Sequence, residues 1–164
     1  LHRTAGNRPA GFPQSDPIMS IFVENRQKRQ KLDLRRLRGR IKRILAALAC
    51  PQADVSVIFV NDAEIRDFNR KYLARDSATN VISFSMREGE FSDVNPSLLG
   101  DIVISVDTAL RDAEREGISL EDELDYLLIH GILHLLGYDH ERSGKEAARE
   151  MEKRQDELFA QLQK

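Results

Sequence analysis

Cysteine and tryptophan are scarce in this chain: Cys50 is its one cysteine in 164 residues, and it has no tryptophan. A single cysteine excludes an internal disulfide, and with it a disulfide-stapled secreted scaffold. No apolar run approaches the roughly 18 residues that span a bilayer, so we expect no membrane partner. These absences fit a protein of the reducing cytoplasm, which is the location we predict.

The first residues lack the apolar core of a signal peptide. Residues 1–18 are rich in Pro and Gly and show neither a helical nor a strand period. We interpret them as an upstream extension or a cloning remnant, with Met19 as the natural start. An organelle-targeting segment is the alternative, but three prolines disfavour the amphipathic helix that it needs. Residues 19–164 are long enough to form one domain with its own core.

Positive charge is concentrated in one segment. The net charge of the chain is only −2, which does not suggest a nucleic-acid-binding protein. Residues 26–43, however, hold ten Lys or Arg and one acid, a net of +9, and the rest of the chain has a net of −11. Such a patch can steer a polyanion to one face. The alternative is a solvated helix face without a partner.

Hydrophobic periodicity predicts an α+β fold, with helices packed against one sheet. Strands are expected at 20–25, 54–61, 80–86 and 100–108, and helices at 32–48, 63–73, 120–136 and 144–162, with a short helix ending near Gly117. The polar segment 88–96 contains Gly and Pro and predicts a loop. The helix over 120–136 becomes apolar almost all round, which is typical of a buried helix.

Three of the four histidines fall within eleven residues, HGILHLLGYDH. His130 and His134 differ by about 40° around a helix axis, so their rings share one face. Gly137 can end the helix and return the chain, which brings His140 toward the other two. Three imidazoles predict one divalent ion, zinc first and other divalent metals next, with an open position for catalysis. The alternative is a set of hydrogen-bonded core histidines.

Gly131 occupies the position at which a related metal-binding motif has its catalytic general base. The spacing of the histidines is also that of metzincin proteases, which carry Glu directly after the first His. Gly131 occupies that position, so peptide hydrolysis loses its usual proton acceptor. Two interpretations of Gly131 stay open: close approach of substrate to the metal, or tight packing of the helix on the sheet.

The segment HGILHLLGYDH (130–140) closely resembles the signature of the YbeY family of metal-dependent endoribonucleases. FNRKY (68–72), TNVISF (79–84) and LLGDIVIS (98–105) resemble further family segments, in the right order, and the similarity covers about residues 20–160. The resemblance implies a zincin-like fold, with a mixed sheet of about four strands packed with five or six helices. It places the metal site at the end of a buried central helix.

The resemblance also implies an activity. It predicts a single-strand-specific endoribonuclease that matures the 3′ end of 16S ribosomal RNA and serves ribosome quality control. The implied partners are ribosomal RNA or the small ribosomal subunit, with ribosome-associated proteins as further candidates. The family's metal ligands carry over onto His130, His134 and His140.

Two positions depart from the family pattern. The family commonly has an Arg with a functional role directly after the Tyr of the FNRKY segment, where this chain has Leu73. Ser85 stands where many relatives have Pro. Arg70 and Arg75 flank the first departure and are candidate replacements for the missing charge.

Further site residues are candidates only. Candidate RNA contacts are Arg70 and Arg75, together with four residues of the basic segment: Arg35, Arg36, Arg40 and Arg43. Asp139 or Asp101 is a candidate to orient a histidine ring, although each also suits a turn. The general base, the cleavage site and the oligomeric state stay open. Two other functions are weighed: a noncatalytic ribosome-assembly factor with a structural metal, and, less favoured, a metalloprotease.

Overall fold

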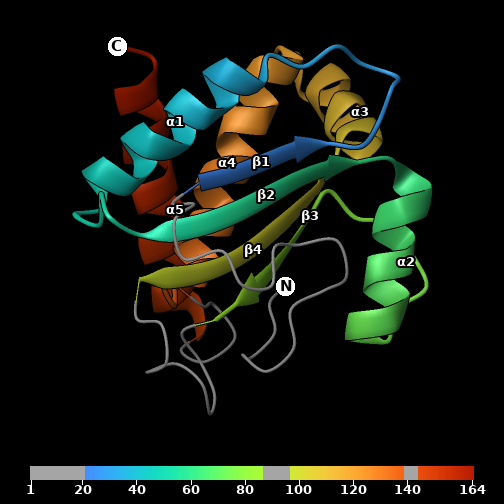
Figure 1. Ribbon diagram of the computed structural model, residues 1–164. Helices are drawn as coiled ribbons and strands as arrows, with labels where there is room; N and C mark the ends of the chain where they lie inside the picture. Colours follow the sequence, from blue (N-terminus) through green and yellow to red (C-terminus); the bar gives the residue numbers. More distant parts are fainter. Residues whose placement is uncertain (1–20, 87–96, 139–143) are drawn as a thin grey trace.

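The computed structural model describes residues 21–86, 97–138 and 144–164 (Figure 1). The predictions made for residues 1–18, 88–96, Asp139 and His140 lie outside these residues. The elements are β1 (Ile21–Asn25), α1 (Leu34–Ala47), β2 (Asp54–Val60), α2 (Asp62–Leu73), β3 (Val81–Ser85), β4 (Leu98–Ser105), α3 (Val106–Glu116), α4 (Leu120–Leu135) and α5 (Gly144–Leu162). Every predicted strand and helix is confirmed, with small shifts at the ends.

The four strands form one mixed sheet in the order β1-β2-β4-β3. β1, β2 and β4 are parallel, whereas β3 runs antiparallel to β4 at the edge. Five helices accompany these strands in the described part of the chain. The predicted α+β class and the predicted mixed sheet of about four strands are therefore confirmed.

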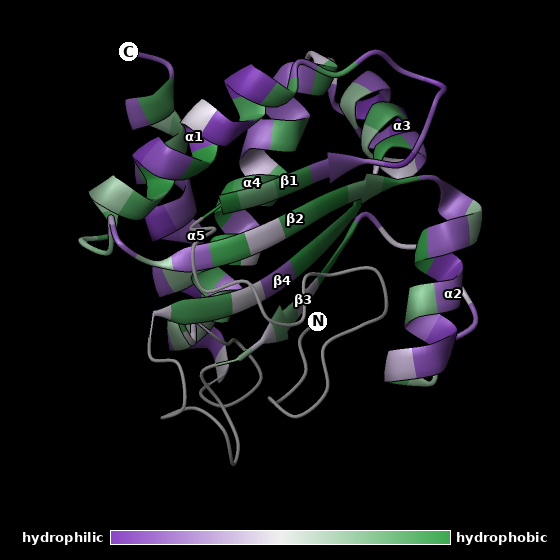
Figure 2. Cartoon of the chain, in the orientation of Figure 1, coloured by the Kyte–Doolittle hydropathy of each residue, from purple (hydrophilic) through white to green (hydrophobic). Residues whose placement is uncertain are grey.

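The two faces of the sheet are covered unequally (Figure 1). α1 and α4 pack on one face, where the larger apolar cluster lies, and α5 packs against these two helices. α2 packs on the other face. Successive side chains of β4 point to opposite faces of the sheet. Ile102 and Ile104 therefore belong to the larger cluster, and Val103 belongs to the smaller one. Figure 2 shows apolar colour along β2, β3 and β4, which are buried on both faces.

Local sequence signals set the helix ends. Asp33, Asn61 and Ser119 each accept a hydrogen bond from the backbone N–H three residues ahead, so each caps a helix N-terminus. α3 ends at Gly117 as predicted, and Gly117 takes a left-handed conformation there, with φ of 70°. None of the helices in the described ranges combines the length and the hydrophobicity needed to cross a bilayer.

Candidate metal centre

His130 and His134 lie on adjacent turns of α4 with their rings together. The two Nε2 atoms are 3.0 Å apart, and the ring centroids are 4.5 Å apart at an interplanar angle of 65°. His134 is 1% exposed, whereas His130 is partly exposed. The predicted pairing on one helix face is therefore present, with one ring buried and the other reaching the surface.

The donor atoms fit a divalent metal ion. Zinc–nitrogen bonds of about 2.0–2.1 Å at tetrahedral angles place two donor nitrogens about 3.3–3.4 Å apart. The Nε2 separation of 3.0 Å needs only a small outward movement to reach that spacing. No group of three or more His, Cys, Asp or Glu side chains suited to a metal occurs within the described residues. The third predicted ligand, His140, lies outside them.

The end of α4 turns the chain as the sequence predicts. Gly137 has φ of 94°, its N–H bonds to the carbonyl of His134, and the N–H of Tyr138 bonds to the carbonyl of Leu133. These two bonds define a Schellman motif, which a glycine in the left-handed region completes at low cost. The chain leaves the helix directly beside the histidine pair.

A groove gives access to the exposed ring. It has a volume of about 310 Å³ and is lined by Tyr126 and His130 of α4 and by Ala148, Met151, Glu152 and Gln155 of α5. Within it, Nε2 of Gln155 lies 2.7 Å from Nδ1 of His130. Gln155 is 5% exposed, so its side chain is almost fully buried at this contact.

Gln155 was not among the predicted site residues. The signal for it is a polar residue inside an apolar stripe, since Met151, Leu158 and Leu162 around it on α5 are all buried. A buried amide needs hydrogen-bond partners, and the partner here is the imidazole.

Gly131 allows α4 to pack closely on the sheet. Of its two interpretations, the structure therefore supports helix–sheet packing and not the approach of substrate to the metal. A Cβ at this position would lie 2.9 Å from Cδ1 and 3.2 Å from Cγ2 of Ile102 on β4. The residue therefore faces the sheet and not the ring face. Ser83 and Ser85 of β3 add hydrogen bonds to the carbonyls of Gly131 and Leu135, so Ser85 serves as a hydroxyl donor that a proline cannot replace.

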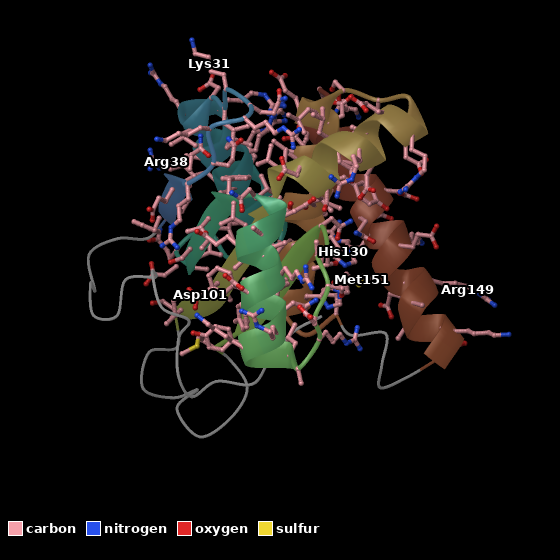
Figure 3. The ribbon with its side chains drawn as sticks, turned by 90° about the vertical axis from the view of Figure 1, so that its right-hand side faces the viewer. Lys31, Arg38, Asp101, His130, Arg149 and Met151 are labelled. Atoms are coloured by element: carbon pink, nitrogen blue, oxygen red, sulfur yellow. The ribbon has the colours of Figure 1, made fainter. Side chains whose placement is uncertain are left out.

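Asp101 lies on the opposite face of the sheet from the histidines. It pairs in register with Ser56 on β2 and with Phe84 on β3, and Phe84 belongs to the cluster beneath α2. Figure 3 shows Asp101 well apart from His130. The sheet therefore separates this carboxylate from the rings, and the prediction that it orients one of them is not supported. The other candidate, Asp139, lies outside the described residues.

Arg36 and Arg40 are held by a buried carboxylate. Asp125 of α4 is fully buried and lies 2.8 Å from Nη2 of Arg36 and 3.6 Å from Nε of Arg40. Burial raises the pKa of Asp125, and Arg36 acts in the opposite direction. Arg40 and Arg43 also donate to the carbonyl of Leu162 at the end of α5. The structure therefore gives Arg36 and Arg40 a role in joining α1 to α4 and α5.

The candidate arginines beside Leu73 remain on the surface. Arg70 of α2 pairs with Asp67 at 2.7 Å, and its side chain is 55% exposed. The side chain of Arg75 is exposed beyond the helix end. Leu73 itself packs partly buried against the smaller apolar cluster. Leu73 therefore makes an apolar contact at the position where the resemblance predicts an Arg.

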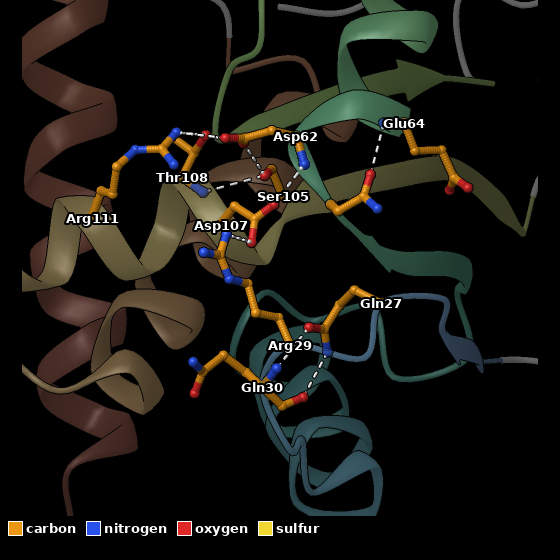
Figure 4. A network of polar contacts seen from close by, with 10 residues as sticks. Gln27, Arg29, Gln30, Asp62, Glu64, Ser105, Asp107, Thr108 and Arg111 are labelled. Atoms are coloured by element: carbon orange, nitrogen blue, oxygen red, sulfur yellow. Dashed lines mark hydrogen bonds and ion pairs between the residues drawn. The ribbon is translucent and has the colours of Figure 1, made fainter.

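A second polar cluster lies where β2 and β4 end (Figure 4). Asp62 accepts hydrogen bonds from Ser105 at 2.7 Å, Thr108 at 2.6 Å and Arg111 at 2.7 Å. Partial burial raises the pKa of Asp62, but these hydrogen bonds outweigh it and hold the pKa below its ordinary value. Its N–H donates to Asp107, which Arg29 also contacts. The cluster joins the N-termini of α2 and α3 and is structural.

Comparison with known proteins gives a consistent result. The family model described as Endoribonuclease YbeY matches residues 22–163. The chain is 54% identical over 141 residues to the Endoribonuclease YbeY of Syntrophus aciditrophicus (strain SB), covering 86% of this chain and 88% of that protein. It is 51% identical over 146 residues to the Endoribonuclease YbeY of Geobacter metallireducens, covering 89% and 97%. The solution structure of TM1509 from Thermotoga maritima matches with a TM-score of 0.58 at 27% identity, over 87% of this chain and 91% of that one.

The fold and the site together define a class of protein. A mixed sheet packed against a buried helix, with a histidine pair near the C-terminal end of that helix, fits a zincin-like fold. The chain belongs to the YbeY endoribonuclease family, as both the family model and the relatives at about 50% identity show.

Proposed function

We propose that the protein is a metal-dependent endoribonuclease that binds zinc through His130, His134 and His140. In this proposal it cleaves single-stranded RNA at the 3′ end of 16S ribosomal RNA, in the cytoplasm and in contact with the small ribosomal subunit. The observation that carries the proposal is the pair of Nε2 atoms 3.0 Å apart at the groove between α4 and α5.

In this proposal the residues of the chain hold the ion and form the groove through which substrate reaches it. A zinc ion held there would act as a Lewis acid toward a phosphoryl oxygen and lower the pKa of a bound water. His134 is buried and would fix the ion against the core, while His130 faces the groove through which substrate reaches it. Three neutral ligands leave the ion its full charge, which favours an anionic substrate such as RNA.

Contacts to the RNA backbone come from exposed cations in this proposal. Arg70 and Arg75 are exposed and follow the FNRKY segment closely, so we keep them as contacts. For Arg36 and Arg40, RNA would compete with the ion pairs to Asp125.

On α1 we therefore assign the RNA contact first to the side of the helix that does not face Asp125. Arg35, Arg38 and Lys42 form no ion pair with any described acid. They lie within about 60° of one another around the axis. Figure 3 shows Arg38 on a side of the molecule remote from His130, so a long RNA is needed to reach both.

The two other functions are less well supported. Relatives at about 50% identity carry the name endoribonuclease, which favours an enzyme over a noncatalytic assembly factor. The protease is disfavoured because Gly131 offers no carboxylate and packs on Ile102.

The test combines zinc content with RNA cleavage. His134→Ala and the larger His134→Gln should both abolish stoichiometric zinc and cleavage of a 16S precursor, because each removes a buried ligand. His2→Ala, which lies outside the histidine motif, is the matched control and should retain both. Full cleavage by either His134 variant would refute metal-dependent catalysis. Loss of zinc with full ribosome-assembly function would instead favour the noncatalytic factor.

A further inference from the structure

Gln155 contacts a predicted metal ligand from a different helix. Its side-chain nitrogen lies 2.7 Å from Nδ1 of His130, on the side of the ring opposite the predicted metal-binding atom. Met151 and Leu158, about one turn before and after it on α5, are apolar and buried, and Gln155 itself is 5% exposed. An amide in such a place is costly unless it is hydrogen-bonded, so the contact fixes both side chains.

The roles of Gln155 and His134 in these two contacts depend on which nitrogen of the His130 ring carries the proton. If the amide N–H donates to Nδ1, the ring proton is on Nε2, and that proton can bridge the 3.0 Å to Nε2 of His134. A metal ion at Nε2 requires the other tautomer, in which Nδ1 carries the proton and needs an acceptor. Rotating the amide by half a turn supplies that acceptor, because the oxygen and nitrogen of a glutamine occupy nearly the same positions.

We propose that Gln155 is a positioning residue for the metal centre, whose amide holds His130 in both tautomers. It donates to Nδ1 when the two histidines bond to each other, and it accepts from Nδ1–H when Nε2 binds the ion. The proposal rests on the metal site proposed above. It adds that α5 determines how well α4 binds the metal, since the ring cannot turn away without breaking its hydrogen bond to the buried Gln155 side chain.

Substitutions at this position separate hydrogen bonding from packing. Gln155→Met keeps the length of the side chain and removes the hydrogen bond, and it should weaken zinc binding by about 10–100-fold. Gln155→Glu keeps an acceptor for Nδ1–H and should bind zinc at least as tightly as the wild type. Gln161→Met makes the same chemical change at an exposed position of the same helix and should have no effect.

The experiment measures zinc affinity by competition with a chromophoric chelator, with thermal unfolding of the metal-free variants as a check on folding. Nitrogen-15 NMR of the wild-type imidazoles reports the tautomers directly and depends on no variant. We expect the His130 proton on Nε2 without zinc and on Nδ1 with zinc.

Three results would overturn the proposal. The first is wild-type affinity in Gln155→Met, and the second is an equal loss in Gln155→Met and Gln155→Glu, which would indicate packing alone. The third is zinc bound through Nδ1 of His130. A wild-type protein that binds no zinc would overturn the metal site and this proposal together, whereas the variant results bear on Gln155 alone.

Discussion

Replacing Gly131 by Ala tests how closely α4 packs on the sheet. The added methyl would lie 2.9 Å from Cδ1, 3.2 Å from Cγ2 and 3.3 Å from Cγ1 of Ile102. Real carbon atoms do not approach to 2.9 Å, so Ile102 or the helix must move. Ile102 is fully buried, and three of its atoms are close at once, so a change of its terminal rotamer alone does not relieve the contact.

The magnitude follows from two opposing effects. Alanine gains about 1 kcal/mol of helix propensity over glycine. Overpacking of a filled core costs about 1–3 kcal/mol, and the simultaneous contacts favour the upper part of that range. We expect Gly131→Ala to lower the free energy of unfolding by about 1–2 kcal/mol. Gly39→Ala is the matched control, because Gly39 lies in α1 with no atom within 4 Å of an added Cβ, and it should gain up to about 1 kcal/mol.

The assay is equilibrium unfolding in urea, arranged as a double-mutant cycle. Ile102→Val removes the Cδ1 atom and by itself costs about 0.5–1.5 kcal/mol. It should relieve the clash with the methyl group that Gly131→Ala adds. The double variant should therefore lose less free energy of unfolding than the two single variants lose together. Strict additivity, or a Gly131→Ala protein as stable as the wild type, would refute the close contact. RNA cleavage should persist in folded Gly131→Ala, because this position faces the sheet and not the groove.

Two further predictions concern charged groups. Arg36→Met removes the 2.8 Å partner of the buried Asp125 carboxylate and should cost roughly 1–3 kcal/mol in urea unfolding. The control is Arg35→Met at the exposed neighbouring residue, which should change the free energy of unfolding by less than about 0.5 kcal/mol. Equal losses in Arg36→Met and Arg35→Met would contradict a stabilising role of the Arg36–Asp125 pair. The pKa of Asp62 is lowered in the folded state, so its contribution to stability is fully present above the unfolded pKa of about 3.9 and is lost as pH falls through the folded pKa. The stability gap between wild type and Asp62→Asn should therefore close below about pH 4, and a gap that stays constant down to pH 2 would contradict this linkage.

Local physics explains why the end of α4 could be predicted from the sequence. Helix period alone places His130 and His134 on one face, and Gly137 marks the stop because few other residues adopt its φ of 94°. Caps and apolar stripes are equally local, which is why every predicted element is present. These features depend on residues only a few positions apart.

Features that depend on contact between distant segments could not be predicted in the same way. The sequence shows that the basic segment is positively charged, but it does not show which side of α1 contacts Asp125. Arg36 and Arg40 therefore could not be distinguished from Arg35. Gln155 showed only as a polar residue in an apolar stripe, because its partner His130 lies on another helix. Tertiary packing decides in each case whether a polar side chain faces solvent or a partner.

The contact at Gly131 also bears on the metalloprotease alternative. A metzincin has its general base at this position, directly after the first histidine. In this chain the space that a Cβ would enter is filled by Ile102 of β4, so a glutamate could fit only if α4 moved away from the sheet. That movement would also stretch the hydrogen bonds by which Ser83 and Ser85 hold α4 to β3. The lack of a carboxylate is therefore a property of the helix–sheet packing, and Gly131→Glu alone should disrupt the fold before it supplies a base.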